Sequence, residues 1–187
     1  MDKLREEIEP FVTLSRDVPG SITSLDLPGL FGNCPQLKAC IFETFRLSNE
    51  ATSIRHVVKP IKVHDGDYTH ELKHGMFVSA PHAIAQRDAS IYAEPDRFMP
   101  ERFLTFDPQT GEHRARYGSL RPYGCGAAMC KGRSFAEKQI IPLAAAVISL
   151  WDLEPAEGSW RIPTMIPGTA VKKPVKDIRV KITRRST

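Results

Sequence analysis

The sequence predicts a mainly α-helical chain with small β-sheets, an α+β fold, and three observations support this prediction. Two stretches rich in apolar residues, 35–47 and 133–151, are long enough to form substantial helices. Short runs of β-branched residues, at 53–58 and 61–63, indicate strands of only a few residues. The longest apolar run, residues 140–151, is interrupted by proline and serine and is too short to span a bilayer.

The individual elements follow in order along the chain. Residues 2–12 are predicted to end a helix, and residues 18–32, which hold several Pro and Gly residues, are predicted to be a connection. Pro35 suits the first turn of the next helix, with Asn33 or Cys34 near its cap. The remaining predictions are strands at 53–58 and 61–63, hairpin material at 72–79 around Gly75, a polar, turn-rich stretch at 105–119, the helix at 133–151 and a half-buried strand at 178–182.

Composition narrows the class of protein. The 187 residues include 26 basic and 22 acidic side chains, a mild net charge of +4. Basic residues gather near the C-terminus, but they alternate with apolar residues and lack aromatic neighbours, so a solvated strand face is favoured over a nucleic-acid site. The four cysteines show no C-x-x-C spacing, which favours neither a disulfide framework nor structural zinc, and we expect Cys34, Cys40 and Cys125 to be small buried residues.

One cysteine stands in a distinctive setting. Residues 121–138 read as a glycine-rich loop that runs into a helix, with Cys130 near the junction. Gly124, Gly126 and Gly132 allow the backbone to turn sharply around the sulfur. The first amides of the following helix are expected to point at Cys130 and to favour its thiolate. Such a thiolate suits a metal in a large, flat cofactor that needs close approach of the backbone.

This loop resembles the cysteine-pocket signature of the heme-thiolate monooxygenases, the cytochrome P-450 superfamily. The signature is an aromatic residue, two residues, Gly, three residues, Cys, one residue and Gly, and it is met by Tyr123, Gly126, Cys130 and Gly132. Two departures stand out: the family usually has Phe at the position of Tyr123, and many members have Arg or His at the position of Ala128. The second change removes a common contact to a heme propionate, so another residue must supply it.

The resemblance runs along nearly the whole chain, and it implies that residues 1–187 are the C-terminal heme-binding region of the fold, a partial domain without the distal helix. It implies heme b as cofactor, with the Cys130 thiolate as axial ligand, and insertion of one oxygen atom of dioxygen into an organic substrate. The distal oxygen-activating residues are not in the chain, so no catalytic residue is assigned, and the isolated chain is expected to bind heme poorly and to be inactive. The implied cofactor-binding residues are Cys130, Arg55, Tyr123, Gly124, Gly126, Gly132 and Arg121.

A charged triad is the second constellation. Glu43 and Arg46 are spaced i and i+3 in an apolar helix, so their side chains can meet, and a buried pair needs a third polar partner. In the family this partner is an arginine further along the chain, and by position it is Arg102 in the segment Phe-Met-Pro-Glu-Arg-Phe. The triad would fasten the segment around Arg102 to the helix, whereas nearby Arg97 is expected at the surface.

Partners also follow from the resemblance. Residues 51–54 and 163–170 resemble substrate-contacting segments, and their apolar side chains suggest a hydrophobic small molecule. Lys131, Arg133 and Lys138 could receive an electron-donating reductase, or they could be ordinary helix surface. We expect an intracellular protein that binds no nucleic acid, and full-length relatives bound to the endoplasmic reticulum by an anchor that this chain does not contain.

Alternatives remain. His70, Glu71 and His74 match the zinc-metallopeptidase pattern H-E-x-x-H, but Gly75 follows directly, and no helix of useful length fits there. A non-catalytic remnant, folded in part or paired with another protein, is a third possibility. Within the family, the loop resembles fungal members and the branch of steroid hydroxylases and prostacyclin synthase. That branch includes isomerases, so the substrate and the reaction type stay open.

Overall fold

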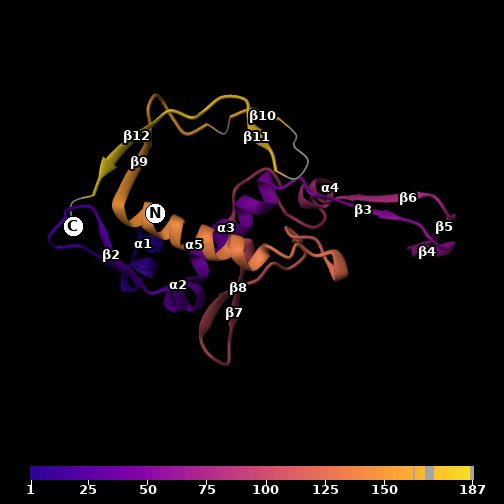
Figure 1. Ribbon diagram of the computed structural model, residues 1–187, viewed down its shortest axis with the longest axis horizontal. Helices are drawn as coiled ribbons and strands as arrows, with labels where there is room; N and C mark the ends of the chain where they lie inside the picture. Colours follow the sequence, from indigo (N-terminus) through magenta and orange to yellow (C-terminus); the bar gives the residue numbers. More distant parts are fainter. Residues whose placement is uncertain (162, 167–170, 186–187) are drawn as a thin grey trace.

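The computed structural model describes residues 1–161, 163–166 and 171–185. Helices form the centre of the molecule, and paired strands project from it (Figure 1). The helices are α1 Asp2–Ile8, α2 Leu27–Asn33, α3 Pro35–Ser48, α4 His82–Gln86 and α5 Arg133–Leu150, with short 3₁₀ helices η1 Glu9–Phe11, η2 Pro100–Phe103 and η3 Gly126–Ala128. The strands are β1 Val12–Leu14, β2 Ile22–Leu25, β3 Thr52–His56, β4 Ile61–Asp65, β5 Tyr68–Leu72, β6 Phe77–Pro81, β7 Leu104–Asp107, β8 Glu112–Ala115, β9 Trp151–Pro155, β10 Met165–Ile166, β11 Lys173–Pro174 and β12 Val180–Arg184.

Each sheet in the described residues is one antiparallel pair: β1 with β2, β3 with β6, β4 with β5, β7 with β8, β9 with β12 and β10 with β11. This mixture of central helices and small sheets is the predicted α+β class. The core lies where α1, α3 and α5 meet. Its buried members include Ile8, Leu37, Phe42, Ile141 and Ala145.

The two long predicted helices are present with nearly the predicted bounds. Helix α3 begins at Pro35 with Cys34 as its N-cap, and α5 runs through Pro142 without interruption. Their apolar faces explain this agreement, because each helix buries residues at helical spacing in the common core.

The prediction of a plain connection at residues 18–32 is wrong, because this stretch holds β2 and α2. The Asp26 side chain accepts a hydrogen bond from Gly29 N at 3.1 Å, and Pro28 lies in the first turn, so both residues start a helix. A Cβ on Gly29 would clash with the Phe11 ring, so glycine is needed here for close packing rather than for flexibility.

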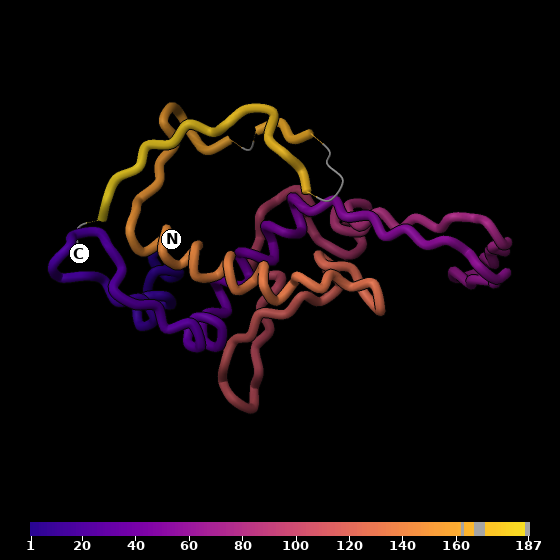
Figure 2. The backbone as a smooth tube through the Cα atoms, in the orientation of Figure 1, coloured from indigo at the N-terminus to yellow at the C-terminus, as the bar shows by residue number. Residues whose placement is uncertain are grey.

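The hairpin also differs from the prediction. Strands β4 and β5 turn at Gly66, with Asp65 opposite Tyr68, whereas Gly75 lies between β5 and β6, which do not pair with each other. Strands β3 and β6 pair closer to the helices than β4 and β5 do, and the four strands form one long ribbon that projects from the helices (Figure 2).

Two further stretches need correction. Residues 105–119, predicted to be polar and turn-rich, also include most of the hairpin β7–β8, which points away from the helices (Figure 1). The C-terminal strand is β12, and its residues are exposed rather than half-buried, since it pairs with β9 in an arc outside the core (Figure 2).

Candidate functional site

The loop before α5 is closed by its own backbone. Cys130 N–H donates to the Tyr123 carbonyl at 2.9 Å, and Met129 N–H donates to the Gly126 carbonyl at 3.1 Å. Gly124 and Gly126 adopt φ of 74° and 66°, which is left-handed backbone that other residues rarely accept. The glycines therefore allow the tight turn that presents Cys130.

The Cys130 side chain lies at the surface of this loop as a free, exposed thiol. A Cβ on Gly132 would lie 3.9 Å from its sulfur, so a glycine keeps this side of the thiol open. The expected amide donors are not seen: no backbone amide of the described residues donates to the sulfur. Helix α5 begins only at Arg133, whose guanidinium donates to the Cys130 carbonyl at 3.0 Å instead.

Aromatic contacts fasten the loop to α3. The Tyr123 ring meets Phe45 edge-on, with ring centroids 5.7 Å apart. Near this contact, Asn49 Nδ2 donates to the Pro122 carbonyl at 2.7 Å. The Tyr123 hydroxyl is buried, and burial together with the charges of Glu137 and Cys130 raises its pKa to about 12. The loop is therefore held against the C-terminal half of α3.

A second aromatic contact joins α3 to α5 and was not predicted. The Tyr117 ring stacks on Phe42 with centroids 3.9 Å apart, and its hydroxyl donates to Glu137 Oε1 at 2.7 Å. No local sequence pattern marks this contact, since the three residues lie on separate parts of the chain.

The structure brings Glu43, Arg46 and Arg102 together. Arg46 Nε and Nη2 donate to the two Glu43 carboxylate oxygens at 2.7 and 2.8 Å, and Arg102 Nε reaches Oε1 at 3.3 Å. Glu43 Oε1 also accepts Met99 N–H at 2.8 Å. Burial by itself raises the pKa of Glu43, but these hydrogen bonds and the charges of both arginines outweigh it and hold the pKa below its usual value.

The guanidinium groups of Arg46 and Arg102 also donate hydrogen bonds to backbone carbonyls. Arg46 Nη1 binds the carbonyls of Gln86 and Pro95 at 2.8 and 2.7 Å, and Arg102 Nη1 binds that of Ala93 at 2.9 Å. The triad thereby fixes residues 86–99 on α3. Its charge is satisfied by many partners, as a buried ion pair requires.

The other arginines take different positions. Arg97 pairs with Glu94 at the surface at 3.1 Å. Arg55 is exposed on β3, and its guanidinium donates to the neighbouring Ile54 carbonyl at 2.8 Å. Arg121 donates to the carbonyls of Gly118 and Leu120.

Strand β3 nevertheless passes beside the loop. The Ser53 hydroxyl lies 3.9 Å from the place that a Cβ on Gly124 would occupy. Residues 51–54 therefore adjoin the cysteine loop. Of the other segment expected to contact substrate, residues 163–166 are described and include β10, and 167–170 lie outside the described residues.

The zinc-like motif has no helical geometry. His70 and Glu71 belong to strand β5, and His74 follows the strand. Among the described residues, no group of three His, Cys, Asp or Glu side chains could hold a metal ion. The burial expected for the other cysteines holds for Cys34, whereas Cys40 is half-buried and Cys125 is exposed because it lies in the open loop.

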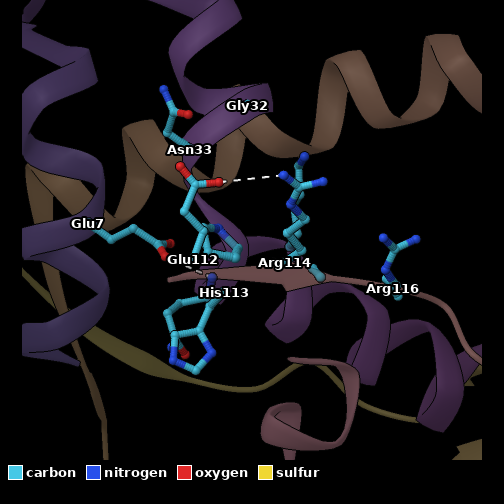
Figure 3. A pocket seen from close by; sticks show the side chains of 11 residues that line it. Glu7, Gly32, Asn33, Glu112, His113, Arg114 and Arg116 are labelled. Atoms are coloured by element: carbon cyan, nitrogen blue, oxygen red, sulfur yellow. Dashed lines mark hydrogen bonds and ion pairs between the residues drawn. The ribbon is translucent and has the colours of Figure 1, made fainter. Parts of the chain in front are cut away.

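A cleft of about 700 Å³ lies at the opposite end of α3, between its N-terminus and β8 (Figure 3). Its acidic side chains include Glu7 and Glu112, and the Glu7 carboxylate accepts hydrogen bonds from the amides of Gln36 and Leu37 at 2.8 and 2.9 Å. Glu7 thus caps α3 from α1, a role that sequence reasoning missed because the two residue groups are far apart in the chain. The basic side chains on the side of β8 include Arg114, within the strand, and Arg116, which directly follows it.

Comparisons with known proteins agree on one family. The family model for cytochrome P450 matches residues 1–182. A cytochrome P450 monooxygenase of Gibberella zeae is 27% identical and is matched over 98% of this chain and 36% of its own length. The mitochondrial sterol 26-hydroxylase of Oryctolagus cuniculus is 31% identical over 75% of this chain and 26% of its own. The Penicillium oxalicum monooxygenase poxD is 28% identical over 71% of this chain and 27% of its own.

Solved structures show the same fold. A retinoic acid-bound cyanobacterial CYP120A1 superposes with a TM-score of 0.72 at 22% identity, covering 98% of this chain and 38% of that one. A cytochrome P450, CYP102L1, gives a TM-score of 0.76 at 20% identity, covering 99% of this chain and 38% of that one. The chain spans about a third of the length of the relatives that it matches. Within the described residues, no helix combines the length and apolar character needed to cross a bilayer.

Proposed function

The chain belongs to the cytochrome P450 family, and on that premise we propose that residues 1–187 form the C-terminal heme-binding region of a heme-thiolate monooxygenase with Cys130 as the axial ligand. The family relationship supports an oxidoreductase of the monooxygenase kind and heme as the family's cofactor. The single observation that carries the assignment to Cys130 is its exposed thiol on a glycine loop that is locked to α3.

The residues present fit a heme group. A free, exposed thiol is a suitable donor for iron, and glycines at 124, 126 and 132 leave room for a flat macrocycle to approach the backbone. Arg55 and Arg121 are the cations proposed for its carboxylates, since each keeps guanidinium donors beyond its contacts to carbonyls. When bound through a thiolate, heme supplies the chemistry that activates dioxygen.

The protein's own contribution is positional. The triad of Glu43, Arg46 and Arg102 fixes residues 86–99 on α3, and Tyr123 fixes the cysteine loop on the same helix. Helix α3 is therefore the common support on which the ligand is held. We propose a structural role for the triad, because its hydrogen bonds end on backbone carbonyls and on each other.

The substrate and the electron donor are further parts of the proposal. We propose a hydrophobic organic substrate near residues 51–54, which adjoin the loop. The exposed Lys131, Arg133 and Lys138 beside the start of α5 offer a basic surface for an electron-donating reductase. We propose an intracellular location; one relative is mitochondrial by its name, so an endoplasmic-reticulum site is not common to all relatives.

Because the chain spans about a third of its relatives' length, we propose that it binds heme weakly and does not turn over by itself. The test is titration of the purified chain with hemin, followed by reduction and exposure to carbon monoxide. We expect the absorption band of thiolate-ligated heme at saturating hemin, and its loss in Cys130→Ser. Cys125→Ser is the matched control, since Cys125 is an exposed thiol of the same loop. Retention of the band in Cys130→Ser would overturn the assignment of the ligand.

A further inference from the structure

Two histidines lie close together on the ribbon that projects from the helices. His56 is the last residue of β3, and His74 lies in the link between β5 and β6. Their ring centroids are 6.2 Å apart, with the ring planes at 71° to each other. Both residues are exposed. The ribbon thus brings together two side chains of the type that binds metal ions most often.

The backbone beneath the two rings is held by hydrogen bonds. Val57 N–H donates to the Met76 carbonyl at 2.8 Å, and Gly75 N–H donates to the Val57 carbonyl at 2.9 Å. These bonds connect the residue that follows His56 to the residue that follows His74. The two imidazoles are therefore kept near each other by the chain before any ligand binds.

The ring nitrogens of this pair are available to a ligand. In the described part of the chain, no hydrogen bond engages the His56 or His74 ring, whereas the His64 and His82 rings each meet a hydroxyl oxygen, at 2.9 and 3.0 Å. A neutral imidazole keeps one nitrogen as an acceptor, and this nitrogen is the one that binds a metal ion. Each ring of the pair can therefore offer a nitrogen to the same ion.

The separation of the rings suits a shared ion. Zinc binds an imidazole nitrogen at about 2.0–2.1 Å, so the centroids of two rings lie about 5.2 Å apart on a tetrahedral ion and about 6.4 Å apart on opposite sides of an ion. The observed 6.2 Å lies within this range. Because both side chains are exposed, rotation of the rings can supply the movement of about 1 Å that tetrahedral geometry requires.

We propose that His56 and His74 form a two-histidine site for a divalent transition-metal ion that prefers imidazole nitrogen, such as Zn²⁺, with water molecules at its other positions. Among the described residues, no third His, Cys, Asp or Glu completes a group of ligands, so the site is open rather than closed like a structural zinc centre. Magnesium and calcium do not suit it, because they prefer oxygen ligands and the pair holds no carboxylate.

A bound ion would connect the end of β3 to the link before β6. This site is different from the H-E-x-x-H pattern, because it uses His56 in place of His70 and Glu71. It also requires no heme, so it stands or falls separately from the assignment of Cys130.

The test is a titration of the 187-residue chain with ZnCl₂ at pH 7.5, followed by the NMR signals of the imidazole groups, because metal binding needs the deprotonated ring. We expect the signals of His56 and His74 to shift together along one binding curve, and those of His70 to stay in place. Signals resolved by residue separate this site from zinc bound to the exposed thiols of Cys125 and Cys130.

Single substitutions distinguish one shared ion from two independent ones. His56→Gln and His74→Gln should each weaken zinc binding at the remaining histidine by about tenfold or more, because that ring loses the effective concentration of a second ligand. Both positions are exposed, so the fold tolerates the changes. His70→Gln is the matched control, since His70 is another exposed histidine of the ribbon, and it leaves the affinity unchanged.

Two results would overturn the site directly: unchanged affinity at His74 in His56→Gln, or no shift at either histidine in excess ZnCl₂. Loss of binding in His70→Gln would assign the ion to the H-E-x-x-H residues instead, and it would equally refute the pair.

Discussion

Glu43 and Arg46 form a bidentate ion pair at 2.7 and 2.8 Å, and neither side chain is exposed to solvent. Such a pair is costly to bury and very costly to break, because removing one charge leaves the other without compensation. The Glu43 carboxylate also offsets part of the positive charge of Arg102 and accepts a hydrogen bond from Met99 N–H. The segments that carry Arg46, Met99 and Arg102 therefore all depend on this one carboxylate.

The first prediction follows from this dependence. Glu43→Gln keeps the shape of the side chain but removes the charge that faces two arginines, so we expect the free energy of unfolding to fall by about 3–5 kcal/mol. Urea denaturation followed by circular dichroism measures it. Glu94→Gln is the matched control, because Glu94 pairs with Arg97 at the exposed surface, where a pair contributes about 0.5 kcal/mol or less. Equal effects of the two changes would contradict the buried role of Glu43.

The second prediction concerns acid. The pKa of Glu43 is lower in the folded state than in the unfolded chain, where a glutamate has a pKa of about 4.3. Its stabilising contribution is therefore complete above that value, and it is lost as the pH falls through the folded-state pKa. The difference in unfolding free energy between wild type and Glu43→Gln should shrink as the pH is lowered from 6 to 3, in denaturant titrations at several pH values. A difference that does not change with pH would show that Glu43 has no lowered pKa.

The third prediction concerns the cap of α3. Glu7 accepts the amides of Gln36 and Leu37 at 2.8 and 2.9 Å, and its negative charge suits the positive end of the helix dipole. We expect Glu7→Ala to lower the free energy of unfolding by about 1 kcal/mol, the cost of losing a typical N-terminal cap. Glu6→Ala, at an exposed position in α1, serves as the control in the same thermal or urea titration. If both variants unfold alike, the capping contacts contribute nothing measurable.

Local signals predicted the parts of the fold that are encoded locally. Pro35 and the apolar spacing marked α3, and the i, i+3 spacing placed Glu43 beside Arg46. The resemblance to a family supplied Arg102, which no spacing could supply, because it lies 59 residues away from Glu43. The neighbourhood of the cysteine was partly predicted: the loop turns at glycines as expected, but the amides of α5 do not reach the sulfur.

Contacts between distant segments could not be predicted in the same way. Gly66 and Gly75 both have positive φ, but the ribbon turns at Gly66. Strands β4 and β5 form the inner hairpin, and β3 and β6, which flank this hairpin in the sequence, pair with each other. Glu7 accepts a hydrogen bond from the first turn of α3, and Glu137 accepts one from the Tyr117 hydroxyl. In both cases the two partners lie far apart in the sequence. Their roles depend on packing, for which one sequence offers no periodic signal.

The fourth prediction concerns the reactivity of the cysteines. Cys125 and Cys130 are exposed thiols, whereas Cys34 is fully buried, and burial with the charge of Glu7 raises its pKa to about 11. We expect a maleimide at pH 7 to label Cys125 and Cys130 within minutes and to leave Cys34 unlabelled, because thiolate is the reactive form. Peptide mass spectrometry of the labelled chain measures each site separately.

Prior addition of hemin extends this experiment. If the Cys130 sulfur binds the iron, saturating hemin should protect Cys130 from the reagent and leave Cys125 labelled at its original rate, so the second thiol is an internal control. Equal protection of both residues would point to general coverage of the loop rather than to ligation. Rapid labelling of Cys34 in the heme-free chain would instead show that the core around α3 is open, because a thiol packed there is inaccessible while the helices stay together.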